Sequence, residues 1–188
     1  MAEPLRLLID RIATPIGELT IVADEDGRLR AVEFSDNEIA LQRDLRRHGG
    51  TRGVALKPAR DPSGFSTALR AYFAGDLRAI DGLAVETGGT EFQRRVWRAL
   101  GKIPCGRTTT YAALARRIGH PTAVRAAGHA NGSNPISIVV PCHRVIGTDG
   151  TLTGYGGGID RKRWLLAHEG VALKENLILR QAQDEALH

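Results

Sequence analysis

Residues 90–128 read TEFQRRVWRALGKIPCGRTTTYAALARRIGHPTAVRAAG, and the architecture of the C-terminal half can be worked out from them. Thr90 and Gln93 have the spacing of a capping box, in which a hydroxyl and an amide satisfy free backbone groups at a helix start. Apolar residues then recur on one helical face: Phe92, Val96, Trp97 and Leu100. The pattern predicts an amphipathic helix that packs against a core.

Two shorter helices are predicted next, with a tight turn between them. Thr110 is placed to cap a helix over 111–118, and Thr122 to cap a helix over 123–128. A glycine and a proline break the chain between the two. Such a pair is the helix-turn-helix pattern, whose second helix enters a groove of DNA. That second helix is built of small residues around one long cation, Arg125, and small side chains let a helix approach DNA closely.

Downstream lies the pentapeptide Pro141-Cys142-His143-Arg144-Val145, which holds one of the two cysteines. The β-branched run 138–140 before it predicts a strand that ends at the cysteine. His143 and Arg144 supply an imidazole and a positive charge, which favour the reactive thiolate form of a cysteine. The residues thus indicate a nucleophilic Cys142, and the alternative is a buried structural cysteine beside a histidine.

The remaining C-terminal pattern is a glycine-rich loop followed by a helix. Residues 147–158 lack the ending of a phosphate-binding loop, so they are interpreted either as a flexible surface loop or as backbone that packs against a flat ligand. Tyr155 is the only aromatic residue in this loop. Asp160 is placed to cap a helix over 161–169, which Gly170 closes.

The N-terminal half shows three strand-like runs and two helical runs: 5–12, 18–23, Leu29–Phe34, 37–48 and 66–74. Residues 51–62 are predicted to form a loop, and 76–89 a connector. The fold class is therefore α+β. A small N-terminal sheet-plus-helix lobe over 1–85 precedes a mainly helical C-terminal lobe over 90–172 with the helix-turn-helix, and a tail over 173–188 carries no motif.

Charge is distributed unevenly along the 188 residues. Residues 91–170 carry 12 Lys and Arg against 4 Asp and Glu, whereas residues 1–90 carry 12 against 14. A polyanionic partner such as nucleic acid explains this excess, and a merely basic surface explains it equally well. Two cysteines do not make a disulfide framework, and no apolar stretch approaches the ~20 residues that span a bilayer. We therefore expect a cytoplasmic protein with no membrane partner.

The C-terminal half of the chain resembles a known protein family. The segment 134–147, NPISIVVPCHRVIG, resembles the active-site signature of the O6-alkylguanine-DNA alkyltransferases, also called methylated-DNA–protein-cysteine methyltransferases. Three further segments are similar to motifs of that family: TEFQ at 90–93, AVRAAG at 123–128 and WLLAHEG at 164–170. The resemblance is dense over 90–170 and loose over the N-terminal lobe.

This resemblance implies direct repair of DNA. A monomer would bind duplex DNA in the minor groove, flip out an O6-alkylguanine, and move the alkyl group irreversibly to a cysteine, once per molecule. O4-alkylthymine is a possible second substrate, and no organic cofactor is expected. Family roles imply five catalytic residues: Cys142 as alkyl acceptor, His143 as base through a water, Glu169 orienting His143, Tyr111 as proton donor and Asn134 holding the loop.

The resemblance also implies which residues contact DNA and base. Arg125 would fill the gap left by the flipped base, and its neighbours would contact DNA: Thr122, Ala123, Ala126, Ala127 and Gly128. Four residues would line the base pocket: Tyr155, Gly156, Gly157 and Val145. Some members hold a zinc in the N-terminal lobe, but residues 1–90 contain no cysteine and only His48, so no metal is expected.

Two departures and three alternatives stay open. Ser137 stands where many members have proline, and Gly156 stands where many have serine or alanine, which puts the preferred alkyl size in doubt. The alternative functions are a lesion sensor without transfer, a cysteine hydrolase and a transcription factor. The sensors lack the reactive cysteine, and neighbouring side chains on an extended segment point apart, which disfavours direct Cys-His contact in a hydrolase. Cys105 is interpreted as a packing cysteine, with redox pairing to Cys142 as the alternative.

Overall fold

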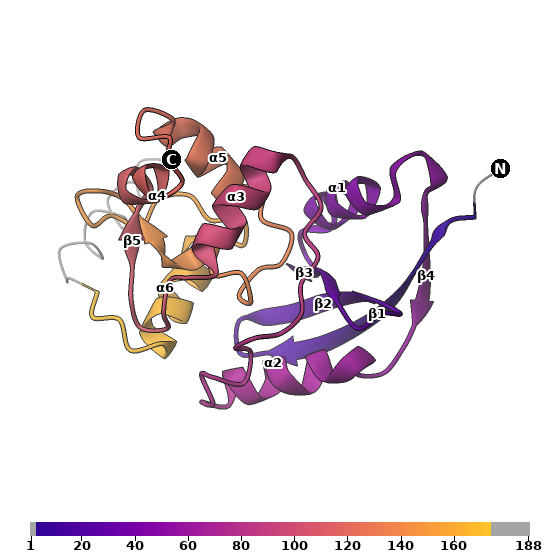
Figure 1. The fold of residues 1–188 in the computed structure, drawn as a ribbon. Coiled ribbons are helices and arrows are strands. Elements are labelled where there is room, and N and C mark those ends of the chain that lie inside the picture. Colours follow the sequence, from indigo (N-terminus) through magenta and orange to yellow (C-terminus); the bar gives the residue numbers. More distant parts are fainter. Residues whose placement is uncertain (1–2, 174–188) are drawn as a thin grey trace, which may run out of the picture.

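The computed structural model describes residues 3–173, so all of the predicted tail except Leu173 lies outside the described residues. Figure 1 shows an N-terminal lobe built on a sheet and a C-terminal lobe built mainly of helices. The α+β fold class is confirmed. No helix among the described residues is long and apolar enough to cross a membrane.

A four-stranded sheet in the order β3-β2-β1-β4 forms the N-terminal lobe. The strands β1 (Leu5–Thr14), β2 (Gly17–Asp24) and β3 (Leu29–Phe34) are antiparallel, and Gly27 provides the positive φ that the β2–β3 turn requires. A fourth strand, β4 (Val54–Pro58), pairs in parallel with β1. The predicted loop 51–62 was therefore wrong in part. This edge strand is almost wholly exposed, so it carries no alternation of buried residues.

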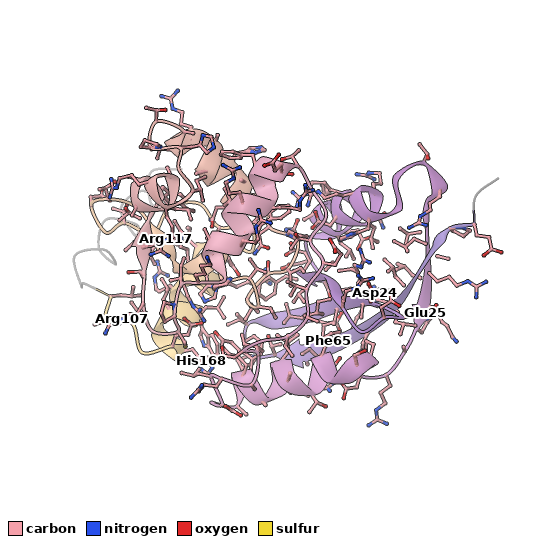
Figure 2. The ribbon with its side chains drawn as sticks, viewed as in Figure 1. Asp24, Glu25, Phe65, Arg107, Arg117 and His168 are labelled. Carbon is pink, nitrogen blue, oxygen red and sulfur yellow. The ribbon has the colours of Figure 1, made fainter. Side chains whose placement is uncertain are left out.

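Different helices pack on the two faces of the sheet. Helix α1 (Glu38–Gly49) packs its Leu41 and Leu45 on one face, against a small separate core. Helix α2 (Phe65–Phe73) lies on the other face, and Figure 2 shows Phe65 directed from α2 towards the sheet. The larger core on this second face continues without a break into the C-terminal lobe. One apolar core therefore joins the two lobes.

The C-terminal lobe contains α3 (Glu91–Leu100), α4 (Tyr111–Arg117), α5 (Val124–Gly132) and α6 (Ile159–His168). Two short parallel strands, β5 (Thr109–Thr110) and β6 (Val145–Ile146), tie it together. The predicted caps at Thr90 and Thr110 are confirmed. Thr90 and Gln93 make both bonds of a capping box, and Thr110 Oγ1 accepts from Ala113 N at 3.1 Å. The helix-turn-helix α4–α5 is present.

Two predicted helix starts were wrong. Helix α5 begins at Val124 without a side-chain cap from Thr122, and it runs on to Gly132. Gly158, not Asp160, is the N-cap of α6, and Asp160 lies inside the first turn, paired with Arg163 at 2.6 Å. In both cases the helix starts one or two residues away from the expected position, where the polar side chain no longer reaches a free N–H group.

Residues 138–140 do not form the predicted strand. They make turns, and Val140 N donates to the carbonyl of Ile136 at 3.0 Å. Buried Ile138 has a φ of 74°, a left-handed conformation that costs a β-branched residue about 1–3 kcal/mol. The apolar, β-branched composition was read correctly as buried, but the chain bends back here instead of extending.

Candidate active site

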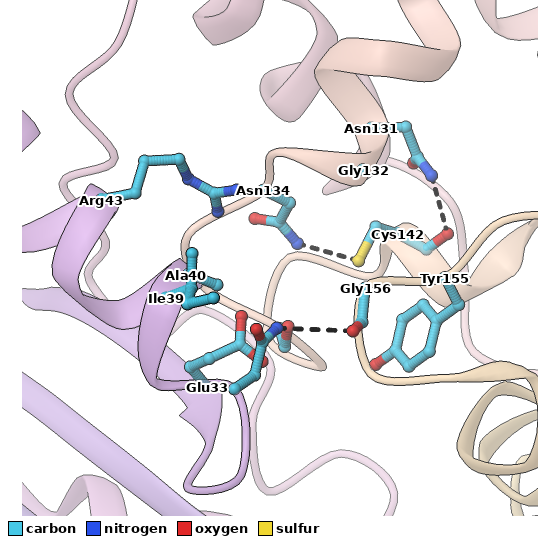
Figure 3. A pocket seen from close by; sticks show the side chains of 12 residues that line it. Glu33, Ile39, Ala40, Arg43, Asn131, Gly132, Asn134, Cys142, Tyr155 and Gly156 are labelled. Carbon is cyan, nitrogen blue, oxygen red and sulfur yellow. Dashed lines mark hydrogen bonds between the residues drawn. The ribbon is translucent and has the colours of Figure 1, made fainter.

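The turning segment places Cys142 at the start of a 3₁₀ turn, η3 (Cys142–Arg144), beneath the surface. Its side chain is 5% exposed. Asn134 Nδ2 lies 3.1 Å from Cys142 Sγ and donates to it, as Figure 3 shows. A donor at this distance stabilises negative charge on sulfur. The sulfur is therefore held in one position beside a group that favours the thiolate.

Asn134 also fixes the loop that carries the cysteine. Its amide donates to the carbonyl of Val140 at 2.7 Å, and its Oδ1 accepts from Ile136 N at 3.0 Å. The same loop is paired with the N-terminal lobe, because Val32 of β3 exchanges backbone hydrogen bonds with Pro135 and Ser137 at 3.0 and 2.9 Å. The sheet thus positions the reactive segment, and the expected role of Asn134 agrees with this geometry.

His143 is fully buried and pairs with Glu169 through Nε2 and Oε1 at 2.9 Å. Because a carboxylate only accepts hydrogen bonds, Nε2 carries the proton, and Nδ1 holds the free lone pair. Nδ1 is buried and has no hydrogen-bond partner among the residues that the structure describes. Among the described residues, no hydrogen bond joins the side chain of His143 directly to that of Cys142. A proton from the thiol therefore needs a relay to reach Nδ1.

Glu169 follows the last turn of α6 and accepts hydrogen bonds from two neighbouring side chains of its own lobe. Arg144 donates to it from Nε and Nη2, both at 2.8 Å, and His143 adds a third bond. Burial opposes ionisation of this carboxyl, but the hydrogen bonds from His143 and Arg144 outweigh burial and hold the pKa of Glu169 well below its usual range. Glu169 is therefore a carboxylate at neutral pH.

The thiol and the imidazole are both uncharged at neutral pH in the free protein. Burial raises the pKa of Cys142 to about 11, although the Asn134 amide lowers it. Burial also lowers the pKa of His143, and the pull of Glu169 does not cancel this effect. The pair is thus a neutral base close to a neutral acid, so proton transfer must accompany attack by sulfur.

A cavity of about 260 Å³ opens beside Cys142 and is lined by both lobes. Residues of the C-terminal lobe form one wall: Asn131, Gly132, Asn134, Ser137, Tyr155 and Gly156. The opposite wall comes from the end of β3 and the start of α1: Glu33, Asn37, Ile39, Ala40 and Arg43. Figure 3 shows the two walls facing each other. Asn37 Nδ2 donates to the carbonyl of Gly156 at 3.4 Å and so joins the walls.

Two predicted pocket residues lie elsewhere. Val145 is buried in β6, where it pairs with Thr109, and Gly157 packs against the ring of Phe34, so close that a Cβ would overlap it. Neither residue lines the cavity. Tyr155 and Gly156 do line it, as expected. The glycine-rich loop turns Gly157 towards Phe34 of the N-terminal lobe, and the β5–β6 pairing holds Val145 in the interior.

Tyr111, the expected proton donor, begins α4 and lies outside this cavity lining. Its hydroxyl donates to the carbonyls of Thr153 and Gly154 at 2.9 and 3.3 Å. The ammonium of Lys162 lies 2.9 Å from the same Thr153 carbonyl and 2.6 Å from that of Val145. Burial lowers the pKa of Lys162 to about 8. If Tyr111 turned towards a ligand, Lys162 would still satisfy these carbonyls.

The expected DNA-contact residues divide by exposure. Thr122, Arg125 and Ala126 are exposed, and Ala123 and Gly128 are half-buried. Arg125 makes no hydrogen bond or ion pair with any residue between 3 and 173. Ala127 is fully buried in the shared core, so its predicted contact with DNA was wrong. The helical turn carries that position towards the interior while its neighbours face outwards.

Several residues of the site were missed from the sequence. Lys162 reads as one more surface cation among Arg161 and Arg163, and Glu33 reads as an exposed residue of a strand. Burial raises the pKa of Glu33 to about 7. No local signal distinguishes such residues, because the burial of Lys162 and the position of Glu33 at the cavity depend on segments far away in the sequence. Within the described residues, no three His, Cys, Asp or Glu side chains are grouped to hold a metal ion.

Comparison with known proteins decides the family. Residues 91–171 match the family model described as 6-O-methylguanine DNA methyltransferase, DNA binding domain, and residues 8–87 match the ribonuclease-like domain of the same methyltransferase. The chain belongs to the 6-O-methylguanine DNA methyltransferase family. The resemblance found in the sequence is confirmed, and it extends to the N-terminal lobe.

Relatives of this methyltransferase family match almost the whole chain. The methylated-DNA–protein-cysteine methyltransferase of Shigella flexneri is 54% identical over 169 residues, which cover 90% of this chain and 99% of that protein. The protein of the same name from Methanosarcina acetivorans is 43% identical over 160 residues, covering 84% and 94%. The crystal structure of Mycobacterium tuberculosis OGT in complex with DNA has a TM-score of 0.70 at 43% identity, covering 87% and 92%.

Proposed function

We propose that this protein repairs DNA by direct reversal, transferring the alkyl group of O6-alkylguanine irreversibly to Cys142. The observation that carries the proposal is the buried Cys142 beside a cavity, followed in the chain by His143, whose pair with Glu169 leaves its Nδ1 without a hydrogen-bond partner among the described residues. The names of the relatives support the same reaction. Buried thiol, buried base and orienting carboxylate follow the logic of an activated nucleophile.

The reaction is a displacement at the alkyl carbon. A bond forms between Cys142 Sγ and that carbon while the bond from the carbon to O6 of guanine breaks, and the electron pair leaves with guanine. The thiol proton passes through a water to Nδ1 of His143. Tyr111 donates a proton to the departing guanine, which leaves as a neutral base. The thioether has no better leaving group than the original lesion, so each molecule reacts once.

Duplex DNA is the proposed partner, bound through the helix-turn-helix α4–α5 from the minor groove. Exposed Ala126 and half-buried Ala123 and Gly128 allow close approach, while Arg125 reaches into the stack and replaces the flipped base. The Mycobacterium tuberculosis relative is described in complex with DNA. We propose that the protein acts as a monomer, with the alkyl-transfer and DNA-binding functions in residues 90–172. Both cysteines are free, which supports a cytoplasmic location.

Intact-protein mass spectrometry tests the proposal. The chain is mixed with a duplex containing one O6-methylguanine, and peptides are then mapped. We expect a gain of one methyl group on the peptide that holds Cys142, saturating at one per molecule. Tight binding to the duplex without any mass change would contradict transfer and favour a lesion sensor. Repeated turnover with an unmodified protein would point to hydrolase chemistry instead.

The substitution Arg125→Ala tests the intercalating role. We expect the rate on duplex O6-methylguanine to fall about 10- to 100-fold, because extruding a base costs a few kcal/mol that the arginine helps to offset. The reaction with free O6-benzylguanine base should stay unchanged, since no stack has to be opened. Arg78→Ala, an exposed cation in the connector, is the matched control. Equal losses on duplex and free base would refute this role.

A further inference from the structure

Glu169 accepts a hydrogen bond from the N-terminal lobe as well as from its own lobe. The hydroxyl of Tyr72, in the last turn of α2, donates to Glu169 Oε1 at 2.8 Å, across 97 positions of sequence. Tyr72 is fully buried, and its ring packs edge-on against Phe73 and His168. No sequence motif marks this residue. Among the described residues, its hydroxyl forms no other hydrogen bond.

The two carboxylate oxygens of Glu169 accept different numbers of the hydrogen bonds described above. Oε2 accepts from Arg144 Nε, whereas Oε1 accepts from His143 Nε2, Arg144 Nη2 and Tyr72 Oη. Tyr72 and His143 therefore draw on the negative charge of the same oxygen. Each donor that binds a carboxylate reduces the charge it offers to the others.

We propose that Tyr72 is a positioning residue for the proton transfer at Cys142, holding Oε1 of Glu169 from the N-terminal lobe and limiting the pull of that oxygen on His143. The proposal rests on the proposed function in one respect, the role of His143 as base. With the Tyr72 hydroxyl present, the Glu169 carboxylate is held in one orientation. His143 then stays neutral, and its Nδ1 can accept a proton. Without the hydroxyl, Glu169 stabilises the charged imidazolium more strongly, so His143 is protonated at higher pH.

Other charged or titratable groups surround this pair and stay unchanged when the hydroxyl is removed. Arg144 lies on the same 3₁₀ turn as His143, and Lys162 and His168 lie on α6. Cys105 lies in the segment between α3 and β5 and faces Glu169 and Tyr72. Arg144 and Cys105 also act electrostatically on the Tyr72 hydroxyl, but Glu169 is the only described residue that forms a hydrogen bond with it, so its removal deletes one hydrogen bond.

The test is Tyr72→Phe, which deletes the hydroxyl and keeps the packed ring. The pKa of His143 is followed by NMR of its Cε1 proton, and single-turnover methyl transfer to Cys142 is followed by mass spectrometry between pH 5 and 9. We expect the pKa of His143 and the acid limb of the rate profile to rise together by about 0.5 to 1 unit. The variant is therefore slower than the parent on the acid limb, and the two rates converge at higher pH, where His143 is neutral in both proteins.

Asp36→Ala is the matched control, because Asp36 also joins the lobes, through Arg161 at 2.6 Å, without touching Glu169. This substitution should leave the pKa of His143 and the pH profile of the rate unchanged. A Tyr72→Phe protein with the parent pH profile would overturn the proposal. So would a uniform loss of rate that Asp36→Ala reproduces, because it would mean that Tyr72 only helps to join the lobes.

A second variant tests the same hydrogen bond in case the Tyr72→Phe protein folds poorly. Site-specific replacement of Tyr72 by 3,5-difluorotyrosine keeps the shape and makes the hydroxyl a stronger donor, so the pKa of His143 should fall. An unchanged or raised His143 pKa would overturn the proposal. The NMR titration does not depend on transfer. If the parent protein gained no methyl group, the proposed function would fail while the effect of Tyr72 on His143 would still be measured.

Discussion

Replacement of Cys142 by alanine is expected to abolish alkyl transfer entirely. Cys142 carries the only thiol among the described residues that line the cavity. The hydroxyls of Ser137 and Tyr155 and the carboxyl of Glu33 are much weaker nucleophiles towards a saturated carbon, so none of them should take over the bond. Affinity for duplex DNA should stay within about twofold of the parent value, because contacts to phosphate dominate such affinity. The measurements are mass gain after incubation with the O6-methylguanine duplex and a binding isotherm on the same duplex.

Cys105→Ala is the control for this substitution. Cys105 is half-buried and free, and it lies outside the cavity lining, so its replacement should leave stoichiometric transfer intact. Residual methylation of the Cys142→Ala protein at another residue would contradict the assignment of the acceptor. A loss of DNA binding together with transfer would show that Cys142 shapes the interface, which the buried sulfur gives no reason to expect.

Glu169→Gln should produce the second large effect, on both rate and stability. An amide offers no charge to Arg144, which is then buried without its partner, and breaking such a pair costs about 3–5 kcal/mol. The amide can also donate to His143 Nε2, which would move the proton to Nδ1 and remove the base. A rate loss of about 10²- to 10⁴-fold is expected, as for other lost general bases. Single-turnover kinetics and urea unfolding measure the two effects.

The same substitution changes the dependence of stability on pH. The pKa of Glu169 is depressed in the folded protein and is about 4.3 in the unfolded chain, so its contribution is complete above about pH 5 and is lost as pH falls. The free energy of unfolding of Glu169→Gln should therefore differ most from the parent at pH 7 and least near pH 3. Glu91→Gln, which alters an exposed pair with Arg95, is the control. If the difference in free energy of unfolding between the parent and Glu169→Gln stayed the same in acid, this would contradict the ionic role of Glu169.

Local signals were enough to predict most helices and strands. The capping residues Thr90 and Thr110 act within four residues of themselves, so their bonds could be read from spacing alone. Strand β4 escaped because an exposed edge strand shows no periodic burial. The segment 138–140 was misread for the opposite reason. Its composition is that of a buried strand, but the hydrogen bonds of Asn134 to this loop hold it in a turn.

The site was predicted where the chain repeats a family motif and missed where the lobes meet. Cys142, His143 and Glu169 lie in matched segments, and the structure brings the last two into contact. Tyr72 and Glu33 belong to the lobe that resembled the family only loosely. Their importance arises from pairings across about a hundred positions, for which a single sequence contains no pattern. Lys162 was missed because burial, and not charge, sets its role.

The pairing of Tyr72 and Arg144 with Glu169 also has a consequence for biosynthesis. Glu169 lies 27 positions after Cys142, near the end of the described chain, whereas Tyr72 belongs to a lobe that a ribosome delivers early. A nascent chain that has already exposed Cys142 still lacks the carboxylate that orients His143. The thiol, which can be used only once, therefore lacks its complete proton-accepting group until Glu169 has also been synthesised.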